Sequence, residues 1–403
     1  MPPIIIARPD HIVSRRQISS AANNVLYGLK DAGYTAYLAG GGVRDLLLKR
    51  SPKDFDVATN ATPEEVKKVF RNCRLIGRRF RLAHVYFHGE IIEVATFRAP
   101  APKETEKPAD NTFREKNGLV LRDNVFGSPE EDALRRDFTV NALFYNIADF
   151  SIIDYANGIE DLENKILRVI GDPATRFTED PVRILRAIRF AAALDFTIEE
   201  SAREAIRTQA PLLEGCSSSR LYEEIQKLLS CGKAERVFEL CCELDVFEHL
   251  FPEIGAWLKA PDGERETHWL EKTFKQIDRW NAAGFRVSPA LLFALLFGEY
   301  HEWVADQIAE KEKLSHAEAL QEATHRHIHQ LRERIQIPKA VTAHIAEIMA
   351  GQPRFLITTA KNAKRMLRHR SFLEAFLYFK FAARTAHRHE EELTWWDEQR
   401  KKK

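Results

Sequence analysis

The feature that most constrains the fold is a change of hydrophobic pattern near residue 172. Before it, short β-branched runs such as 91–96 alternate with amphipathic stretches such as 62–70, as in a sheet flanked by helices. After it, strand-like runs fade and apolar residues recur at helical spacing between prolines. The pattern predicts an α+β protein, in which a small mixed-sheet head is followed by an all-helical remainder.

Composition limits the class of protein. A chain of 403 residues exceeds one ordinary core, so several modules are expected. No apolar run approaches the length of a membrane span, and the N-terminal apolar run is too short for a secretory signal. The five cysteines lack paired metal spacing and favour reduced thiols. We therefore expect a cytoplasmic protein without a membrane partner.

A D-x-D pair, Asp54-Phe-Asp56, is the first motif that carries chemistry. Side chains two residues apart on a strand face the same side, so both carboxylates can meet one hard cation. Mg²⁺ prefers oxygen ligands and takes one or two carboxylates together with substrate phosphates. The pair therefore predicts a metal site, although an isolated D-x-D often marks only a solvated turn.

A glycine-rich turn, Gly40 to Asp45, ends nine residues before the pair and strengthens this interpretation. Gly41 and Gly42 allow the backbone to approach phosphate oxygens, and the helix that follows begins with free N–H groups. Arg44 adds a charge-assisted contact. Together the two motifs predict a site for a triphosphate and a metal ion.

Phosphoryl transfer at a metal site commonly uses a third acidic group. Glu93 lies in an otherwise apolar strand and is one candidate, as a further metal ligand. Asp137 is the other, because it follows Arg136 and precedes Asn141 by one turn of an expected helix. The sequence does not choose between the two acids.

A third motif runs from Glu179 to Arg189 and combines an acid with spaced arginines. At about 100° per residue, Arg183, Arg186 and Arg189 share one helix face opposite an apolar face. Asp180 is either a helix N-cap or, with Arg183, an acceptor and donor pair for the edge of a nucleobase. The arginines exceed what solubility requires, so the pattern favours base and phosphate binding.

Two stretches are basic and contain no acid, although the formal net charge is only +1. Residues 71–81 hold five Arg, and residues 354–370 hold six Lys or Arg. Such local surfaces can bind phosphates in a nearly neutral protein, or can simply be solvated.

Three strings occur in the order and spacing of a known family. They are LAGGGVRDLLLKRSPKDFDVATNATPEEV, RRDFTVNALFYN and EDPVRILRAIRFAAALDF. Over residues 35–195 the chain resembles class II nucleotidyltransferases, which include tRNA CCA-adding enzymes and bacterial poly(A) polymerases. Residues 11–19, 75–85 and 121–127 resemble the poly(A) polymerases more closely.

The resemblance implies roles for the matching residues. Asp54 and Asp56 correspond to the metal ligands, and Asp137 corresponds to the third catalytic acid of the polymerases. The nucleotide-binding set expected from the motifs is Gly41, Gly42, Arg44, Arg136, Asn141, Asp180, Arg183, Arg186 and Arg189.

The resemblance also implies an architecture, with a five-stranded head and helical neck and body regions that grip RNA. The expected parts are an arm at 1–20, a nucleotidyltransferase head at 21–172, a neck at 173–255 and a body at 256–403. The family's polymerases end in a longer basic tail than residues 401–403, which makes 354–370 the candidate RNA surface. Residues 99–118 are predicted to form a mobile loop.

The implied activity is the addition of AMP from ATP to RNA 3′ ends without a template, in the service of RNA decay. Two Mg²⁺ ions, or Mn²⁺ in their place, would be the cofactors. A CCA-adding enzyme shares the same catalytic residues and remains an alternative. An inactive RNA-binding relative is a second alternative, which the intact acidic residues argue against.

Overall fold

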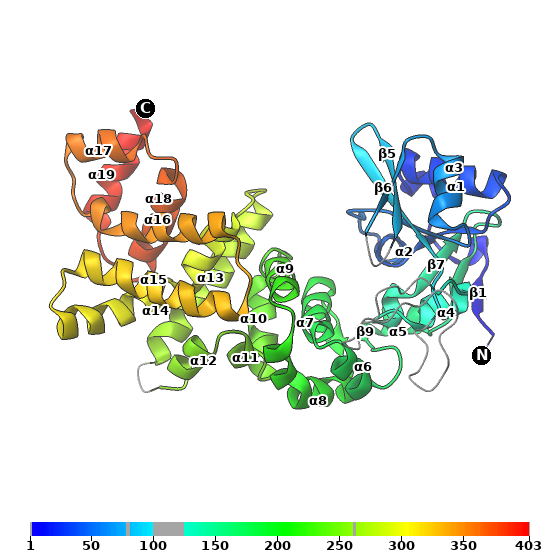
Figure 1. Cartoon of the computed structure of the whole chain (residues 1–403), viewed down its shortest axis with the longest axis horizontal. Helices are drawn as coiled ribbons and strands as arrows, with labels where there is room; N and C mark the ends of the chain where they lie inside the picture. Colours follow the sequence, from blue (N-terminus) through cyan, green and yellow to red (C-terminus); the bar gives the residue numbers. More distant parts are fainter. Residues whose placement is uncertain (1, 78–80, 100–124, 261–262, 403) are drawn as a thin grey trace, which may run out of the picture. The chain divides into compact units, whose positions relative to one another are not determined.

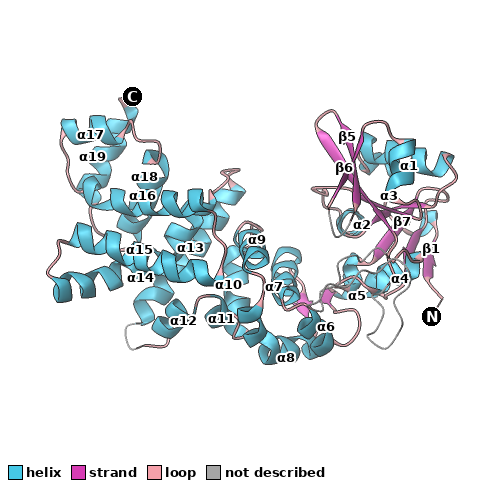
Figure 2. Cartoon of the chain, in the orientation of Figure 1, coloured by secondary structure: helices cyan, strands magenta, loops and turns pink. Residues whose placement is uncertain are grey.

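The computed structural model describes residues 2–77, 81–99, 125–260 and 263–402, so the loop predicted at 99–118 lies almost wholly outside the described residues. The chain forms two compact units, Met1–Arg176 with Phe196–Ala202 and Phe177–Asp195 with Arg203–Lys403. Every described strand belongs to the first unit, and the second is helical (Figures 1 and 2). This division confirms the predicted α+β class.

The first unit contains a mixed sheet of eight strands in the order β1-β8-β7-β2-β3-β6-β5-β4. Their bounds are β1 Ile4–Ile6, β2 Ala36–Ala39, β3 Asp56–Thr59, β4 Cys73–Ile76, β5 Leu82–Phe87, β6 Glu90–Thr96, β7 Leu143–Asn146 and β8 Ile152–Asp154. Among the described strands of this sheet, only β3 and β6 pair in parallel. The implied count of five strands is wrong, because short strands extend the sheet at both edges. One of them, β1, comes from the N-terminal arm and pairs with β8.

The helices of this unit pack on the sheet or follow its strands. They are α1 Ser20–Asp31, α2 Gly41–Leu47, α3 Pro63–Val69, α4 Pro129–Leu134, α5 Gly158–Asn164 and α6 Pro173–Glu179, which reaches the second unit. Helix α3 lies in the amphipathic stretch 62–70 and begins there because Thr62 and Glu65 form a capping box and Pro63 takes the first helical position. A separate two-stranded sheet pairs β9 (Ile166–Leu167) with β10 (Thr197–Ile198).

An aromatic core lies against the middle of the large sheet. Phe97 and Phe144 are fully buried, with ring centroids 6.1 Å apart in an edge-to-face arrangement, and Tyr37 is 5.7 Å from each. Aromatic pairs of this kind add to the free energy gained by burial. The core therefore holds β2 and β7 rigidly at the strand ends where the polar motifs begin.

The second unit is built from α7 Val182–Leu194, most of α8 Glu200–Gln209, and α9 to α19. The later helices are α9 Ser218–Leu229, α10 Ala234–Glu243, α11 Phe247–Leu250, α12 Pro252–Leu258, α13 Gly263–Ala282, α14 Pro289–Glu312, α15 His316–Arg334, α16 Lys339–Phe355, α17 Ala360–Met366, α18 Phe372–Thr385 and α19 Glu390–Lys401. The aromatics of α18 belong to the core, since Phe376 and Phe379 pack with Phe355 and Trp396. No described helix combines the length and apolarity needed to cross a membrane.

Candidate active site

The D-x-D pair lies where β3 begins. Asp56 is paired in register with Ala39 of β2 on one side and with Glu93 of β6 on the other. Residues opposite each other on neighbouring strands project to the same face, so Glu93 shares the face of Asp56. Asp54 precedes Asp56 by two residues, just outside the strand. The structure therefore brings two of the predicted carboxylates together through sheet register.

The electrostatics of Asp56 reflect this crowding of acids. Partial loss of water contact, then the charges of Glu93 and Asp54, raise the pKa of Asp56 to about 6, while Arg136 acts in the opposite direction. The side chain nevertheless remains exposed on its outer side, so solutes can reach it. A cation placed among these carboxylates would relieve their repulsion and favour their ionised forms.

A cavity of about 290 Å³ adjoins these acids within the first unit. Its described lining includes Asp56, Glu93, Arg98, Asp132, Arg135 and Arg136. His84 of β5 lies opposite Glu93 in register, with its Nε2 3.6 Å from the Glu93 carboxylate. Carboxylates and arginines therefore border one hollow, which suits a ligand that carries phosphates and a metal ion.

The glycine turn is shaped by its neighbours as well as by its conformation. Gly40 has φ +68°, a region that favours glycine, and its N–H donates to the carbonyl of Leu143 at 2.9 Å. A Cβ at position 40 would lie 2.6 Å from Nη1 of Arg136. Glycine is therefore required here partly because the Arg136 guanidinium packs over the turn.

A hydrogen-bonded chain links α2 to the second motif. Arg44 is buried and donates to Oδ1 of Asn141 at 2.6 Å and to Oδ1 of Asp45 at 2.7 and 2.9 Å. The Asn141 amide donates in turn to Asp137 at 3.2 Å, and the Phe138 N–H donates to the same carboxylate at 2.9 Å. Three predicted residues thus form one cluster that orients the Arg44 guanidinium.

The expected helix between Asp137 and Asn141 is wrong, although the two side chains do meet. Phe138 is extended, and only Thr139–Asn141 form a short 3₁₀ turn. The backbone of this segment pairs with residues 168–170 instead, for example from the Ile170 N–H to the Asp137 carbonyl at 3.1 Å. These hydrogen bonds to residues 168–170 use backbone groups that a helix would need, so the start of the segment stays extended.

Arg136 completes this side of the cavity. Its Nη2 donates to Asp132 at 3.0 Å, its Nη1 donates to the Asn141 carbonyl at 3.2 Å, and its guanidinium lies 5.2 Å from the centre of the Phe144 ring. Arg176 donates to the carbonyls of residues 135 and 136, each at 2.8 Å. Sequence reasoning missed Asp132 and Arg176. Asp132 stands four residues before Arg136, a spacing that could have suggested this ion pair, whereas Arg176 has no such spacing to the motif residues.

In the second unit, Asp180 lies just before α7. One of its oxygens accepts from Arg220 of α9 at 2.7 Å. The other, Oδ1, is buried and has no hydrogen-bond partner within the described part of the chain. A buried acceptor without a donor is costly unless a ligand supplies one. Arg220 was missed because no local pattern connects it to Asp180.

The three arginines of α7 differ in their surroundings. Arg183 donates to Glu179 at 3.1 Å, and the Arg186 guanidinium lies 5.5 Å from the centre of the Phe190 ring. Arg189 donates to the buried carboxylate of Glu224 at 2.5 Å and so ties α7 to α9. The predicted basic face is therefore partly engaged in holding the helices together.

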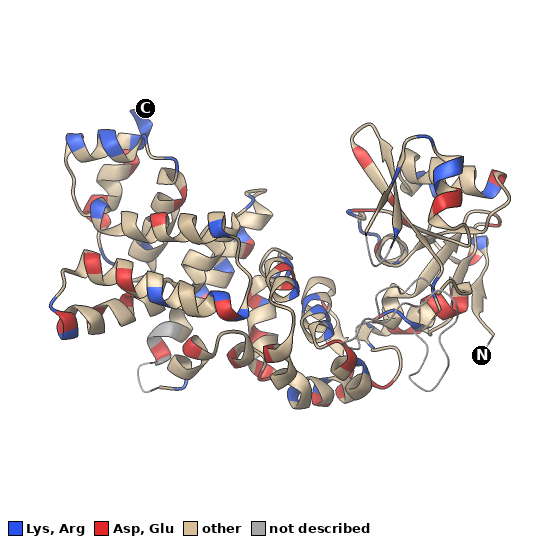
Figure 3. Ribbon diagram, in the orientation of Figure 1, with Lys and Arg blue, Asp and Glu red and all other residues tan. Residues whose placement is uncertain are grey.

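The two basic stretches are also partly neutralised. Arg81 pairs with Glu64 at 2.7 Å, and Arg370 pairs with Glu347. Residues 78–80 of the first stretch lie outside the described residues. Three of the six cations of the second stretch, Lys361, Lys364 and Arg365, lie on α17, whereas both signs of charge are mixed along most other helices (Figure 3).

The donor set of the first unit is consistent with a hard metal ion. Among residues 2–77, 81–99, 125–260 and 263–402, no three His, Cys, Asp or Glu side chains are already arranged as a metal cage. Mg²⁺ does not require one, because waters and substrate phosphates complete its coordination. Asp54, Asp56 and Glu93 offer only oxygen, which fits Mg²⁺ or Mn²⁺ rather than metals that prefer thiolates.

The mixed-sheet head with its paired carboxylates and glycine turn defines a nucleotidyltransferase. The family model described as the poly A polymerase head domain matches residues 36–168. Two further models match: the probable RNA and SrmB-binding site of polymerase A at 195–258 and the polymerase A arginine-rich C-terminus at 312–403.

Comparisons with individual proteins also point to this group of nucleotidyltransferases. Poly(A) polymerase I of Escherichia coli O6:H1 is 43% identical over 98% of this chain and 85% of its own length. The CCA-adding enzyme of Lactobacillus helveticus is 38% identical over 56% of this chain and 53% of its own. The crystal structure of the Bacillus stearothermophilus CCA-adding enzyme in complex with CTP matches with a TM-score of 0.61 and 25% identity, over 94% of this chain and 81% of that one. The chain belongs to the poly(A) polymerase family of nucleotidyltransferases.

Proposed function

We propose that this protein adds AMP from ATP to RNA 3′ ends without a template and thereby promotes RNA decay in the cytoplasm. The observation that carries nucleotidyl transfer is the register of Asp56 with Glu93, beside Asp54 and an arginine-lined cavity. The choice of polyadenylation over CCA addition is supported by the 43% sequence identity to a poly(A) polymerase I over 98% of this chain.

Asp54, Asp56 and Glu93 are the proposed holders of Mg²⁺, or of Mn²⁺ in its place. A divalent cation bound there would supply charge stabilisation to the phosphates and to the RNA 3′-hydroxyl. We favour Glu93 as the third acid because it shares the sheet face of Asp56. Asp137, the third acid implied by the resemblance, stays a prediction, and its contacts with Asn141 and Phe138 suit a positioning role.

The phosphates of ATP are proposed to meet Arg44, Arg136 and the first N–H groups of α2, at Gly41 and Gly42. Backbone N–H groups in a first helical turn have no intrahelical acceptor and suit anions. Arg44 is held by Asn141, so its guanidinium is oriented before the nucleotide arrives. Pre-oriented charges lose less entropy when they bind a ligand.

Asp180 is the proposed reader of the base, with Arg183, Arg186 and Arg189 as its predicted partners. The unpartnered Asp180 Oδ1 is an acceptor that suits the exocyclic amino group of adenine. Cytosine also carries an amino donor, so this oxygen alone does not separate ATP from CTP. For that reason CCA addition remains the second candidate function.

The test is an incorporation assay with Mg²⁺, an RNA oligomer with a 3′-hydroxyl and one labelled nucleotide at a time. Long ladders with ATP and little product with CTP support polyadenylation. Use of CTP followed by a single A, on tRNA ends only, would refute it in favour of CCA addition. No incorporation at any Mg²⁺ concentration would favour an inactive RNA-binding relative. Asp54→Ala should abolish AMP addition while leaving the circular dichroism spectrum unchanged.

A further inference from the structure

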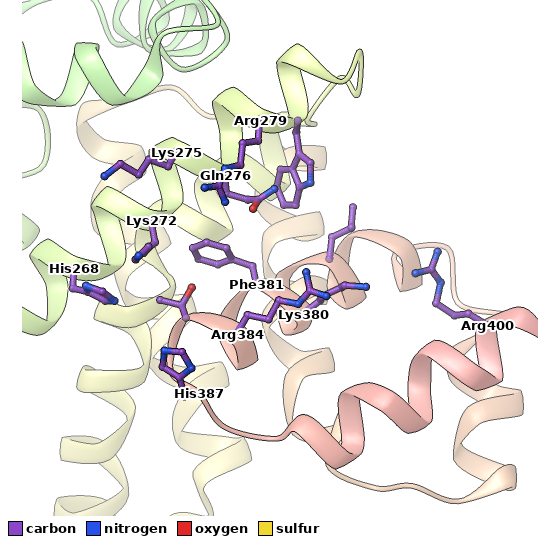
Figure 4. Close-up of a pocket in the computed structure, with 13 residues that line it drawn as sticks. His268, Lys272, Lys275, Gln276, Arg279, Lys380, Phe381, Arg384, His387 and Arg400 are labelled. Carbon is purple, nitrogen blue, oxygen red and sulfur yellow. The ribbon is translucent and has the colours of Figure 1, made fainter.

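A basic cavity of about 410 Å³ lies in the second unit, where α13 meets α18 and the end of α19. None of the described residues that line it is acidic, and its cations are Lys272, Lys275, Arg279, Lys380, Arg384 and Arg400. Figure 4 shows the side chains of α13 and α18 lining the hollow from different sides. Because the whole chain has a net charge of only +1, this concentration of positive charge is local.

Three of these cations are already compensated. Lys275 pairs with Glu235 at 3.1 Å, and Lys380 pairs with Asp397 at 3.1 Å. Arg400 lies 3.9 Å from the same Asp397 carboxylate. These ion pairs hold three of the cationic side chains at the rim of the cavity. The uncompensated positive charge therefore comes from the other three.

Lys272, Arg279 and Arg384 are exposed and have no acidic partner in the part of the chain that the structure describes. The neighbouring acid Asp278 does not serve them, because both of its oxygens accept N–H groups at the start of α10, at 2.7 and 3.1 Å. Three uncompensated cations around one hollow repel each other unless an anion lies between them. The cavity therefore suits a ligand with several negative charges.

Aromatic surface accompanies the charge. Trp280 is half-buried and lines the same cavity as Phe381. Single-stranded nucleic acids bind in positively charged grooves in which bases stack on aromatic side chains. A hollow of about 410 Å³ has room for about one nucleotide, and a double helix is too wide to enter it. Charge, aromatic surface and size together favour one strand of RNA.

We propose that this cavity binds the phosphate backbone of single-stranded RNA through residues other than those proposed to act on the 3′ end, with Trp280 as a base-stacking surface. The choice of RNA as ligand rests on the proposed function. The site differs from the 354–370 stretch singled out in the sequence, where Arg370 is paired with Glu347. It anchors the RNA, so the enzyme elongates long RNA more efficiently than RNA too short to reach both sites.

The first experiment measures binding without catalysis. The full-length triple variant Lys272→Gln, Arg279→Gln, Arg384→Gln is titrated into labelled oligo(A) of about 20 nucleotides in EDTA, without ATP, over a series of salt concentrations. The Kd should rise at least about tenfold at ~100 mM salt, and the slope of log K against log salt should fall by about 2, as expected for three lost phosphate contacts. The matched control is Lys311→Gln, Arg332→Gln, Lys339→Gln, which removes three exposed cations that lie outside the cavity.

Two outcomes would overturn the proposal: wild-type affinity and salt slope in the triple variant, or an equal loss in the control. An equal loss of affinity for a duplex would refute the single-strand assignment. Trp280→Leu should weaken oligo(A) binding by about 5-fold to 150-fold, and Trp280→Phe should recover most of it. If Phe restored nothing and both variants had wild-type melting curves, stacking on residue 280 would be wrong.

Activity then separates this inference from the proposed function. In the triple variant, KM for long RNA should rise while kcat at saturating RNA and addition to a primer of about five nucleotides stay near wild type. A protein that binds oligo(A) through the cavity but adds no AMP would refute only the proposed function. A protein that adds AMP normally but binds oligo(A) independently of these cations would refute only the anchor site.

Discussion

The carboxylates at the start of β3 allow a quantitative prediction, through Glu93→Gln. The substitution keeps the shape of the side chain and removes one negative charge in register with Asp56. Two charges about 5 Å apart repel by about 1 kcal/mol in water and more at lower dielectric. Glu93 keeps 45% of its side-chain surface exposed, so we use the screened value. The pKa of Asp56, which is about 6 in the native protein, should then fall by somewhat less than one unit.

Proton linkage sets the direction in which stability and metal affinity change with pH. Because the folded-state pKa of Asp56 is raised from 3.8 to about 6, the metal-free protein should lose stability as pH rises through about 6. A bound metal ion reverses this preference, because it requires the carboxylate form. Metal affinity should therefore fall as pH drops below about 6, and in Glu93→Gln the same fall should begin at a lower pH. The lost ligand should also weaken metal binding about tenfold at pH 8.

The assay is Mn²⁺ binding followed by electron paramagnetic resonance from pH 5 to pH 8, alongside thermal unfolding in EDTA. Glu163→Gln on α5 is the matched control, because it removes one exposed carboxylate without touching the cavity. If Glu93→Gln and Glu163→Gln gave the same affinities and the same pH midpoint, the coupling between Glu93 and Asp56 would be refuted.

Three further substitutions test the scaffold. Gly40→Ala should lower the free energy of unfolding in urea by about 1–3 kcal/mol, because φ +68° and ψ −128° disfavour a side chain and Arg136 must move. An unchanged free energy of unfolding would contradict this. Asp137→Asn should raise KM for ATP with a smaller fall in kcat, and a kcat loss of about a thousandfold or more would instead make Asp137 a catalytic residue. Glu224→Ala should destabilise the second unit by about 3–5 kcal/mol, since it leaves Arg189 unpaired, and a calorimetric transition unchanged from wild type would refute the structural role of that pair.

The parts of the site that the sequence predicted are local ones. Asp54 and Asp56 are close enough to interact electrostatically, as their spacing suggested, although Asp54 precedes β3 and strand alternation does not place it. A glycine turn before a helix is likewise a short-range signal. The contact between Asp137 and Asn141 was also predicted, although for the wrong reason. A spacing of four residues brings the side chains together in a helix, and here an extended residue followed by a 3₁₀ turn does so.

What the sequence could not supply depends on pairings between distant segments. The choice between Glu93 and Asp137 rests on the parallel register of β3 with β6, which no spacing along the chain encodes. Arg220 reaches Asp180 only because α9 packs beside α7. Packing of this kind depends on how two apolar helix faces interlock, and composition shows the faces but not their alignment.

The basic cavity shows why a run of charges along the sequence is a poor guide to where a polyanion binds. The stretch 354–370 is conspicuous because its cations are close together in the sequence. In the structure they are divided among α16, α17 and the turn after α17, and Arg370 of that turn is paired with Glu347. Lys272 and Arg384 are separated by more than a hundred residues and still line one hollow. A polyanion responds to the summed potential of nearby charges, whatever their order along the chain. The geometry of α13 and α18 is therefore a better guide to RNA contact than the density of Lys and Arg in the sequence.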